Sequence, residues 1–374
     1  MCVCTSMIDK IEVISERGNG FGKQFKPIEQ ELRGNPRFAS FRPSKHYLAV
    51  GDLRPFGFDA IMHLEQRRYG TSKLELLDTG TKKLGEMCST VEDLLDGDPL
   101  RHRVSRIDLC ADVAGIALTW FRDHIRVKRK QWLAEFSQES KMGKKFYGTY
   151  YWGKRPSCLR VYDKVAERKI EYDRWCRRTI REERKAWGQE NAIAKPEDRK
   201  PLLLPELPDF LEWLAIELPI SQQARRAQAA IPGLEDPEQL QCFPVVTRVE
   251  NQMGGRVPEN LSSLHLVKTN AREFDPFAGL ELLTGRREVP DPNAKDASGK
   301  YIWDPVRYAT GIGIRELFKT WGAQQAWNIL DRQRHGARIL ETYRDFIPDT
   351  GEPGITPAAL RDRYQATVTQ QLAA

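Results

Sequence analysis

Apolar and polar side chains alternate through the segment Cys158-Leu159-Arg160-Val161-Tyr162-Asp163-Lys164. A period of two is typical of a β-strand with one buried face. Leu159 and Val161 point to one side of this predicted strand, and Arg160, Tyr162 and Lys164 point to the other. The polar side therefore presents a phenol between two cations. Two other segments of the chain repeat this pattern.

The second segment spans residues 104–113 and the third spans residues 245–250. Both place charged side chains on one side of the strand: Arg106, Asp108 and Asp112 in the second, where Cys110 shares their side, and Arg248 and Glu250 in the third. Strands with one charged side are common at the surface of antiparallel sheets. Three strands with matching arginine, acidic and tyrosine content predict more, namely one polar sheet face that has a function.

The remaining pattern predicts an α+β fold with a mostly antiparallel sheet. Short strands are expected at residues 11–14, 47–51, 57–62 and 73–77, and a hairpin at residues 146–152 and 159–162. Helices are expected at residues 89–95, 118–138, 163–189, 209–230 and 303–345. Residues 195–208 hold four prolines and are expected to form a linker.

Composition favours a globular protein with an acidic partner. The 374 residues include 59 Lys and Arg against 52 Asp and Glu, which gives a net charge of +7 and a pI near 8.9. This excess is mild, but twelve of the basic residues lie between Lys154 and Lys185, against six acidic ones. A basic region of this kind favours nucleic acid binding.

The seven scattered cysteines predict no disulfide framework, and Cys2-x-Cys4 has no second pair at zinc-finger spacing. We expect a reducing, cytoplasmic location. The first residues lack the pattern of a signal peptide, and no stretch approaches the ~20 apolar residues that span a bilayer.

Four short motifs follow one another along the chain: Arg106-x-Asp108-x-x-x-Asp112, Gly148-Thr149-Tyr150-Tyr151-Trp152-Gly153, Arg160-Val161-Tyr162-Asp163-Lys164 and Arg248-Val249-Glu250. In this order they resemble the signatures of the replication initiation factor family. These are plasmid and phage proteins of the Rep-trans type, which start rolling-circle replication. The resemblance is densest over residues 100–165 and again near residues 245–252.

The resemblance implies a site-specific nick in supercoiled origin DNA by a tyrosine, which stays attached to the 5′ phosphate until the strand is rejoined. It also implies a divalent metal ion, a recruited host helicase and a homodimer. The expected partners are thus double-stranded origin DNA and single-stranded DNA, with no membrane. On this basis the domains are expected to be a loosely ordered arm at 1–45, a catalytic nicking domain at 46–277 with a helical insertion at 165–240, and a C-terminal helical region and tail at 278–374.

Tyr162 is the expected nucleophile. An unperturbed tyrosine has a pKa near 10, so little phenolate exists at neutral pH. Arg160 and Lys164 lie about 7 Å along the strand on either side of it, and nearby cations favour the phenolate. Arg248 is expected to hold a phosphate oxygen. The alternative is an ordinary strand tyrosine that packs in the sheet, with Tyr150, Tyr151 and Tyr172 as the other candidate nucleophiles.

Carboxylates are the expected ligands of Mg²⁺ or Mn²⁺, because hard cations prefer oxygen. Asp108 and Glu250 are the favoured ligands, and Asp112 is a third candidate. Residues four apart on a straight strand are roughly 13 Å apart, so Asp108 and Asp112 cannot ordinarily hold one ion together. The alternative is that Arg106–Asp108 and Arg248–Glu250 are ion pairs.

Exposed cations near these motifs are the expected DNA contacts: Arg126, Lys128, Arg129, Lys130, Lys154, Arg155, Arg177 and Arg178. For the run after residue 121, a solvated helix face is the equally weighted alternative. The aromatic pair at 150–151 is expected to pack in a strand or to stack on bases.

Two rival functions remain open. The six histidines include no His-hydrophobic-His pair, which disfavours the nicking enzymes that hold their metal in that way. His335-x-x-Arg338 followed by Tyr364 has the form of a tyrosine recombinase motif. A protein that recognises an origin or operator without cutting it is the non-enzymatic alternative, and basic helices with interleaved Trp and Tyr suit it equally well.

Overall fold

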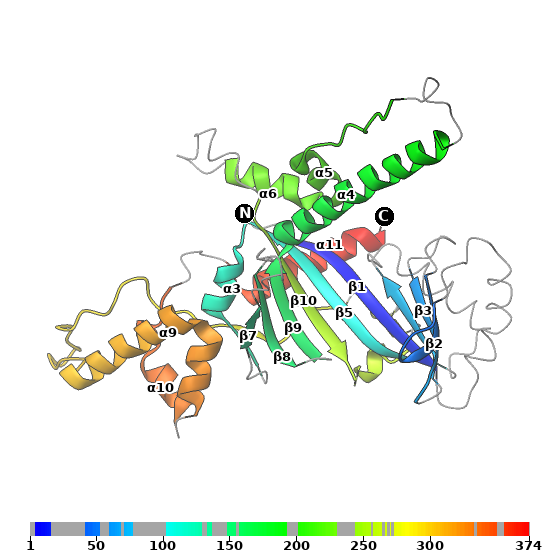
Figure 1. Cartoon of the computed structure of the whole chain (residues 1–374). Helices are drawn as coiled ribbons and strands as arrows, with labels where there is room; N and C mark the ends of the chain where they lie inside the picture. Colours follow the sequence, from blue (N-terminus) through cyan, green and yellow to red (C-terminus); the bar gives the residue numbers. More distant parts are fainter. Residues whose placement is uncertain are drawn as a thin grey trace.

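A nine-stranded antiparallel sheet lies at the centre of the computed structural model, with helices on both of its faces (Figure 1). The sheet and helices confirm the predicted α+β class. The structure describes residues 4–15, 42–52, 60–68, 71–77, 102–128, 133–136, 148–154, 157–192, 201–229, 244–255, 257–263, 266–267, 270, 273–332, 335–349 and 355–373.

The strand order is β2-β3-β4-β1-β5-β10-β9-β8-β7. The strands are β1 (Cys4–Ser15), β2 (Tyr47–Asp52), β3 (Ala60–Gln66), β4 (Lys73–Leu77), β5 (His102–Ala114), β7 (Leu133–Phe136), β8 (Thr149–Lys154), β9 (Ser157–Asp163) and β10 (Val246–Gly254). A separate two-stranded sheet joins β6 (Ile125–Val127) to β11 (Leu280–Leu282).

The three strands with alternating charge lie side by side. β10 pairs with β5 on one edge and with β9 on the other, both antiparallel. β9 and β10 are neighbours in space although the whole helical insertion separates them in sequence. The prediction that they share one sheet face is therefore confirmed.

The helices are α3 (Leu118–His124), α4 (Lys164–Glu190), α5 (Phe210–Glu217), α6 (Ile220–Ala229), α9 (Pro305–Asp331), α10 (Gly336–Thr342) and α11 (Pro357–Ala373), with 3₁₀ turns η5 (Glu259–Leu261) and η7 (Arg344–Phe346). Asp163 starts α4, because its carboxylate accepts hydrogen bonds from the backbone N–H groups of Val165 and Ala166. Asp209 and Glu212 form a capping box that starts α5 in the same way.

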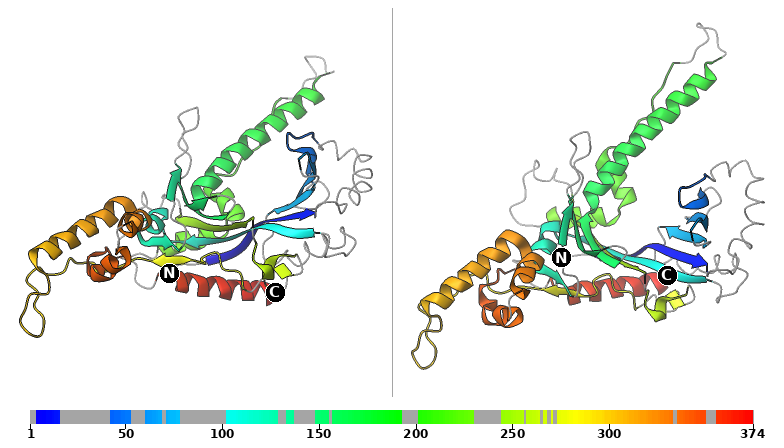
Figure 2. Two further views of the ribbon diagram at one scale, coloured as in Figure 1. Left: turned by 90° about the horizontal axis from the view of Figure 1, so that it is seen from below. Right: turned by 60° about the horizontal axis from the view of Figure 1, so that its bottom comes forward.

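The apolar sheet face packs on α11 and on residues around Phe277. Leu109, Val161 and Val249 belong to this core together with Phe277 and Tyr364. Figure 2 shows α11 against one face of the sheet and α4 rising from the other. Each fully buried Leu, Val or Phe side chain of this kind contributes about 1.5–3 kcal/mol relative to an exposed one.

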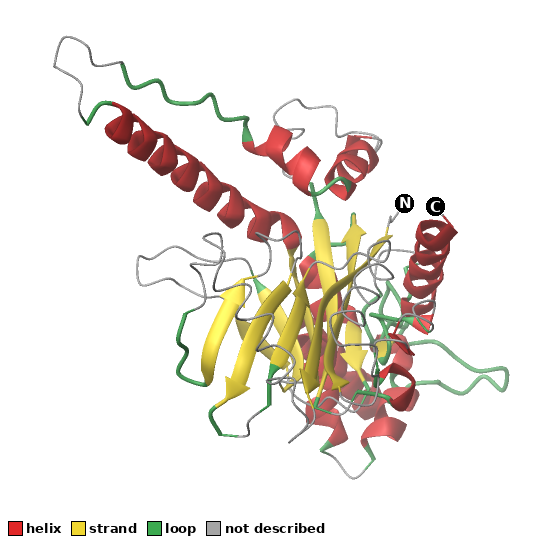
Figure 3. Cartoon of the chain, turned by 90° about the vertical axis from the view of Figure 1, so that its right-hand side faces the viewer, coloured by secondary structure: helices red, strands yellow, loops and turns green. Residues whose placement is uncertain are grey.

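The helical insertion covers one end of the opposite, polar sheet face. Ala114 and Val246, at the ends of β5 and β10, pack with Val165 of α4 and Phe210 of α5 in a second apolar cluster. From there α4 projects away from the sheet, and residues 201–208 run back beside it (Figure 3). The Tyr172 hydroxyl ties the two together by donating to the Pro208 carbonyl oxygen at 2.7 Å.

Helices α9 and α10 form a third apolar cluster that contacts α3 and β6. A kink at Gly322, with φ of 73°, divides α9. The buried side chain of Gln324 accepts a hydrogen bond from the Val127 backbone N–H at 2.8 Å. These contacts fix the kinked helix to the segment after β5.

The structure corrects three predictions. The helix expected over 118–138 ends at His124, and β6 follows, because Ile125 and Val127 are buried against β11. Residues 4–15, expected to be a loosely ordered arm with a short strand at residues 11–14, form the twelve-residue strand β1 next to β5 in the interior of the sheet. Residues 357–373, assigned to a tail, form α11.

The other predicted elements agree with the structure where it describes them. The strands at residues 47–51 and 73–77, the hairpin of β8 and β9, and the helix at 163–189 are confirmed. The helix expected over 209–230 is divided into α5 and α6 at Leu218, just before Pro219, because proline cannot continue a helix from within. The helix expected over 89–95 lies outside the described residues.

Candidate functional site

The strand register places the predicted site residues in rows across the polar sheet face. Arg248 of β10 lies opposite Asp112 of β5 on one side and opposite Tyr162 of β9 on the other. One step along the same face, Glu250 lies between Cys110 and Arg160. Paired side chains on adjacent strands are about 4.5–5.5 Å apart at Cβ, so the members of each row are neighbours.

Arg248 is the centre of the first row. Its Nε and Nη2 atoms donate to the two carboxylate oxygens of Asp112 at 2.6 and 2.8 Å. Its Nη1 atom donates to Asp9 of β1 at 3.1 Å. Arg248 and Asp112 are both buried, so a two-pronged ion pair joins β5 and β10 in the sheet interior.

Asp9 is a site residue that the sequence analysis missed. The register between β1 and β5 shifts between Ile8 and Lys10, which leaves Asp9 as an extra residue in a β-bulge. The bulge also explains why Ile8 and Ile11 are both buried although they are three residues apart. That break in the period of two is the sequence signal for the bulge, and it limited the predicted strand to residues 11–14.

The other two predicted metal ligands also form ion pairs. Asp108 accepts from Nε and Nη2 of Arg106 at 2.7 and 2.5 Å. Glu250 accepts from Nη1 of Arg160 at 3.2 Å and from the side-chain amide of Gln252. The alternative pairing is therefore present for Arg106–Asp108, whereas Arg248 pairs with Asp112 rather than with Glu250.

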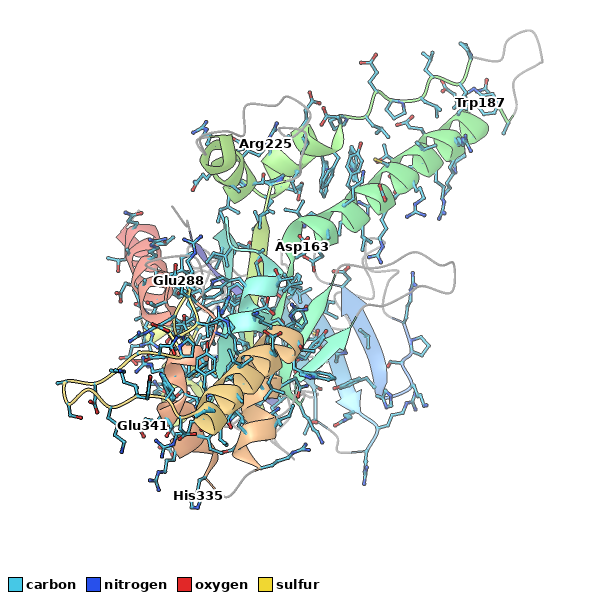
Figure 4. The ribbon with its side chains drawn as sticks, turned by 90° about the vertical axis from the view of Figure 1, so that its left-hand side faces the viewer. Asp163, Trp187, Arg225, Glu288, His335 and Glu341 are labelled. Atoms are coloured by element: carbon cyan, nitrogen blue, oxygen red, sulfur yellow. The ribbon has the colours of Figure 1, made fainter. Side chains whose placement is uncertain are left out.

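Tyr162 lies among cations in the sheet interior. The Arg160 guanidinium carbon is 4.0 Å from the centre of its ring, and the Lys164 Nζ is 5.8 Å from it. Lys164 is the first residue of α4 rather than a strand residue, and it forms an ion pair with Glu167. Tyr162 itself is only 1% exposed. Figure 4 labels Asp163, the next residue, at the base of α4.

Burial dominates the acid–base behaviour of this row. Burial raises the pKa of Tyr162 well above its ordinary value, although the charge of Arg248 acts in the opposite direction. Burial would also raise the pKa of Asp112, but the Arg248 charge and hydrogen bonds more than offset it and the pKa is lowered. Asp112 and Arg248 are therefore a charged pair, while Tyr162 is a neutral phenol at physiological pH.

Asp108 behaves differently from Asp112. Burial raises the pKa of Asp108 to about 6, and the charges of Glu250 and Asp9 add to this effect. Its hydrogen bonds with Arg106 lower the pKa without overcoming the burial. The polar face therefore carries a carboxyl group that changes its charge close to neutral pH.

The three predicted metal ligands do not form a prepared ligand set. All six of their carboxylate oxygens accept a hydrogen bond from an arginine or from Gln252. Within the described residues, no group of three or more His, Cys, Asp or Glu side chains could hold a metal ion. An ion bound here would compete with these hydrogen bonds, so the Mg²⁺ or Mn²⁺ requirement stays a prediction that comes from the resemblance.

The polar face continues onto β1, β4 and β3 with side chains that the sequence analysis did not select. Glu75 of β4 accepts from Lys10 at 2.9 Å and from Lys73, and its oxygen lies 3.2 Å from His63 Nε2. Burial opposes ionisation of Glu75, but these cationic and imidazole groups lower its pKa. Glu12 links this cluster to the site, because it lies near both Lys10 and Arg106.

The predicted DNA contacts have varied surroundings. Arg126 forms an ion pair with Glu281 and lies 3.5 Å from the Trp327 ring centre, which is a packing role between β6, β11 and α9. Lys128 is more exposed and lies 3.7 Å from Glu281. Like Lys128, the predicted residues Lys154, Arg177 and Arg178 are exposed, whereas Arg129, Lys130 and Arg155 lie outside the described residues.

The alternative tyrosines lie outside the row of Asp112, Arg248 and Tyr162. Tyr150 is buried in the main core, and Tyr172 packs on the helical insertion. Tyr151 is half-buried on the polar face opposite Arg160. Tyr364, the recombinase candidate, lies in the main core, where its ring packs edge-on against Phe277.

The rest of the recombinase motif does not join Tyr364. His335 and Arg338 belong to the start of α10, which packs on α9 in a different cluster. The fully buried Tyr364 is therefore part of the core beneath the sheet, and the structure gives the recombinase alternative no site.

Comparison with known proteins finds no matching family and a weak structural likeness. No protein-family model matches the chain, and no curated protein matches it. A solved structure of a rolling circle replication initiator protein from Geobacillus stearothermophilus is similar over 92% of this chain and 98% of that chain, with 11% sequence identity and a TM-score of 0.33. At these values the likeness supports no conclusion about this chain. Within the described residues, no helix has the length and apolar character needed to cross a membrane.

Proposed function

We propose that this protein nicks and rejoins one DNA strand at an origin through Tyr162, and thereby starts rolling-circle replication of a plasmid or phage-like element. The observation that carries the proposal is the row Asp112–Arg248–Tyr162, which brings together three of the four motifs that resemble the initiator family. Arg160, from the same motif as Tyr162, lies against its ring.

The chemistry is a transesterification. The Tyr162 phenolate oxygen attacks the phosphorus, a new P–O bond forms, and the bond from phosphorus to the 3′ oxygen breaks. The 3′ oxygen leaves and takes up a proton, while the proton of the phenol is lost to solvent. The reverse reaction rejoins the strand without ATP, because the phosphotyrosine retains the energy of the broken bond.

Arginine side chains supply the positive charge that phosphoryl transfer needs. Arg248 acts through its charge, since its guanidinium group donates hydrogen bonds to Asp112 and Asp9. Arg160 is the cation that meets the phosphate. Its side chain is 19% exposed, and its partner Glu250 can be replaced by a phosphate oxygen.

The Tyr162 phenol becomes accessible only when DNA binds. The phenol is 1% exposed, so a phosphate cannot reach it in the described conformation. Transfer of Arg160 from Glu250 to a phosphate removes the cation that covers the ring. It also frees one carboxylate oxygen of Glu250 from its hydrogen bond with Arg160. That oxygen could then bind Mg²⁺ or Mn²⁺.

A nicking assay tests the proposal. Supercoiled DNA carrying the gene and its flanks is incubated with the protein and Mg²⁺, Mn²⁺ or a chelator, next to the variants Tyr162→Phe and Tyr151→Phe. We expect open circular DNA with protein covalently bound to the 5′ end for the wild type and for Tyr151→Phe, and none for Tyr162→Phe. Equal nicking by Tyr162→Phe would show that another residue is the nucleophile. Nicking in the presence of chelator would show that the reaction needs no divalent metal ion.

The second candidate is a DNA-binding protein that does not cut. It is favoured by the buried phenol with its raised pKa and by the ion pairs that occupy every predicted metal ligand. Specific binding to the origin without any nick, under all metal conditions, would support this candidate. In that case Tyr162→Phe binds DNA as well as the wild type does.

A further inference from the structure

Helix α4 carries a row of basic side chains along its outer half. The row, called the α4 basic stripe, consists of Arg174, Arg177, Arg178, Arg181, Arg184 and Lys185, and all six are exposed. With 3.6 residues per turn, these six positions fall within about 120° of the helix circumference. Of these six residues, only Arg177 and Arg178 were expected from the sequence to contact DNA. The helical geometry of α4 places the other four on the same face.

The other side of α4 is covered. Trp175 lies 6.3 Å from Trp213 of α5 between ring centres, and Tyr172 packs on Phe210 and bonds to Pro208. Residues 201–208 return along this side, as Figures 1 and 3 show. Because the apolar side is already occupied by the chain itself, the stripe faces away from the insertion.

Charge pairing differs between the two halves of the helix. Near the sheet, each cation has an acidic partner one turn away: Lys164–Glu167, Arg168–Glu171 and Lys169–Asp173. Among the residues that the structure describes, none of the six stripe residues forms an ion pair. The sequence thus neutralises the base of α4 and leaves positive charge on its projecting half.

We propose that the α4 basic stripe lies along the phosphate backbone of duplex DNA next to the nicking site. This inference rests on the proposed function, because it takes the same DNA as the partner. The stripe is about 17 Å long, at 1.5 Å per residue. A duplex presents about one phosphate charge per 1.7 Å of its axis, so several phosphates lie within reach of the six cations.

Duplex DNA fits this surface better than a single strand does. Proteins that bind single strands combine cations with exposed aromatic rings on which bases stack. The aromatic side chains of α4 are Tyr172, Trp175 and Trp187, and by the helical period they fall on the side away from the stripe. The stripe therefore offers charge without a stacking surface, which suits a backbone contact without base readout.

A salt titration of duplex binding tests the inference. The test variant combines Arg177→Gln, Arg181→Gln and Arg184→Gln. The control combines Arg286→Gln, Arg307→Gln and Lys319→Gln, which removes the same charge from exposed positions near and on α9. Binding of a 30-base-pair origin duplex is measured from 50 to 300 mM salt.

For the test variant we expect the slope of log K against log[salt] to fall by about 2–3, since each phosphate contact contributes ~0.9. Affinity at 150 mM salt should fall at least tenfold, and the control should change it less than twofold. Equal slopes for the two variants would overturn the inference. An equal loss for the single strand of the same length would overturn the assignment to duplex DNA.

The two proposals fail in different ways. If the stripe binds DNA but Tyr162 is not the nucleophile, Tyr162→Phe nicks normally while the stripe variant still loses affinity. If Tyr162 is the nucleophile but the stripe is not a contact, the stripe variant keeps the full salt slope while Tyr162→Phe loses nicking. Because the stripe residues are exposed, the unfolding midpoint of the stripe variant should match that of the control.

Discussion

Arg248 and Asp112 face each other across β10 and β5, and two hydrogen bonds of 2.6 and 2.8 Å join them in the buried interior of the sheet. This pair fixes the relative position of the two strands that carry most of the candidate site. It also places the positive charge of Arg248 next to Tyr162, and the carboxylate of Asp112 stabilises that buried charge.

Removal of one partner of this pair should destabilise the fold strongly. Arg248→Met leaves the Asp112 carboxylate buried without its main cation, which costs about 3–5 kcal/mol in buried pairs of this kind. Urea unfolding measures the change in the free energy of unfolding. The control is Arg286→Met, which breaks the exposed Arg286–Asp345 pair and should cost less than about 1 kcal/mol. Similar losses for both variants would contradict the structural role of the buried pair.

Asp108 should make stability depend on pH between about 4 and 6. Its folded-state pKa of about 6 lies above the unfolded value of about 4, so in this window the folded protein binds more protons. The free energy of unfolding should therefore fall as pH rises through the window, by up to roughly 3 kcal/mol.

The variant Asp108→Asn isolates this effect because it cannot titrate. The stability of the wild type relative to Asp108→Asn should be lower at pH 7 than at pH 4, as measured by urea unfolding at both values. Other carboxylates with lowered pKa values, such as Asp112, titrate in both proteins and cancel in the difference. A difference that does not change with pH, or that rises with pH, would refute the assignment.

The raised pKa of Tyr162 predicts the pH dependence of nicking. Below the pKa of the nucleophile, the phenolate fraction rises tenfold with each pH unit, and burial keeps the pKa of Tyr162 well above 10. Single-turnover nicking should therefore accelerate about tenfold per unit from pH 7 to 9 without a plateau. A plateau in this range would mean that the attacking group has a lower pKa. Arg160→Gln should retain the slope and reduce the rate, since it removes the cation at the ring.

Gly322 should be required for the packing of α9 on α3. Its φ of 73° is strained for other residues, and a Cβ atom there would lie 2.5 Å from the Arg122 carbonyl oxygen. We expect Gly322→Ala to cost more than about 1–2 kcal/mol in the free energy of unfolding. Gly313→Ala on the same helix is the control, because its Cβ meets nothing within 4 Å and alanine favours helix by about 0.5–1 kcal/mol. Destabilisation by both variants would argue against the close approach.

Alternation in the sequence was sufficient to predict β5, β9 and β10, because each of these strands carries apolar side chains on one face and mostly polar side chains on the other. It could not predict which arginine pairs with which acid, since pairing follows from register. The sequence suggested Arg248 with Glu250, two residues away on the same strand, but the register places Asp112 directly opposite. Register depends on contacts between distant segments and leaves little trace in any one of them.

The missed elements have local reasons. Ile125, four residues after Phe121, continues the apolar side of a helix, and only the pairing of β6 with β11, 155 residues further on, makes this segment a strand. The helix α11 did leave a signal, because Leu360, Tyr364 and Val368 are spaced by four and all are buried. The bulge at Asp9 broke the period of two in β1, so only residues 11–14 of this strand were predicted.

The contact of α11 with β1 ties the two ends of the described chain into one core. During synthesis, all strands of the sheet therefore leave the ribosome before α11, whose buried residues share a core with Leu109 and Val249. The part of the apolar sheet face that α11 covers stays exposed to water until this helix has been synthesised. Any shortened version that ends before residue 357 inherits the same uncovered surface, so its failure to bind or cut DNA would report on misfolding rather than on the site.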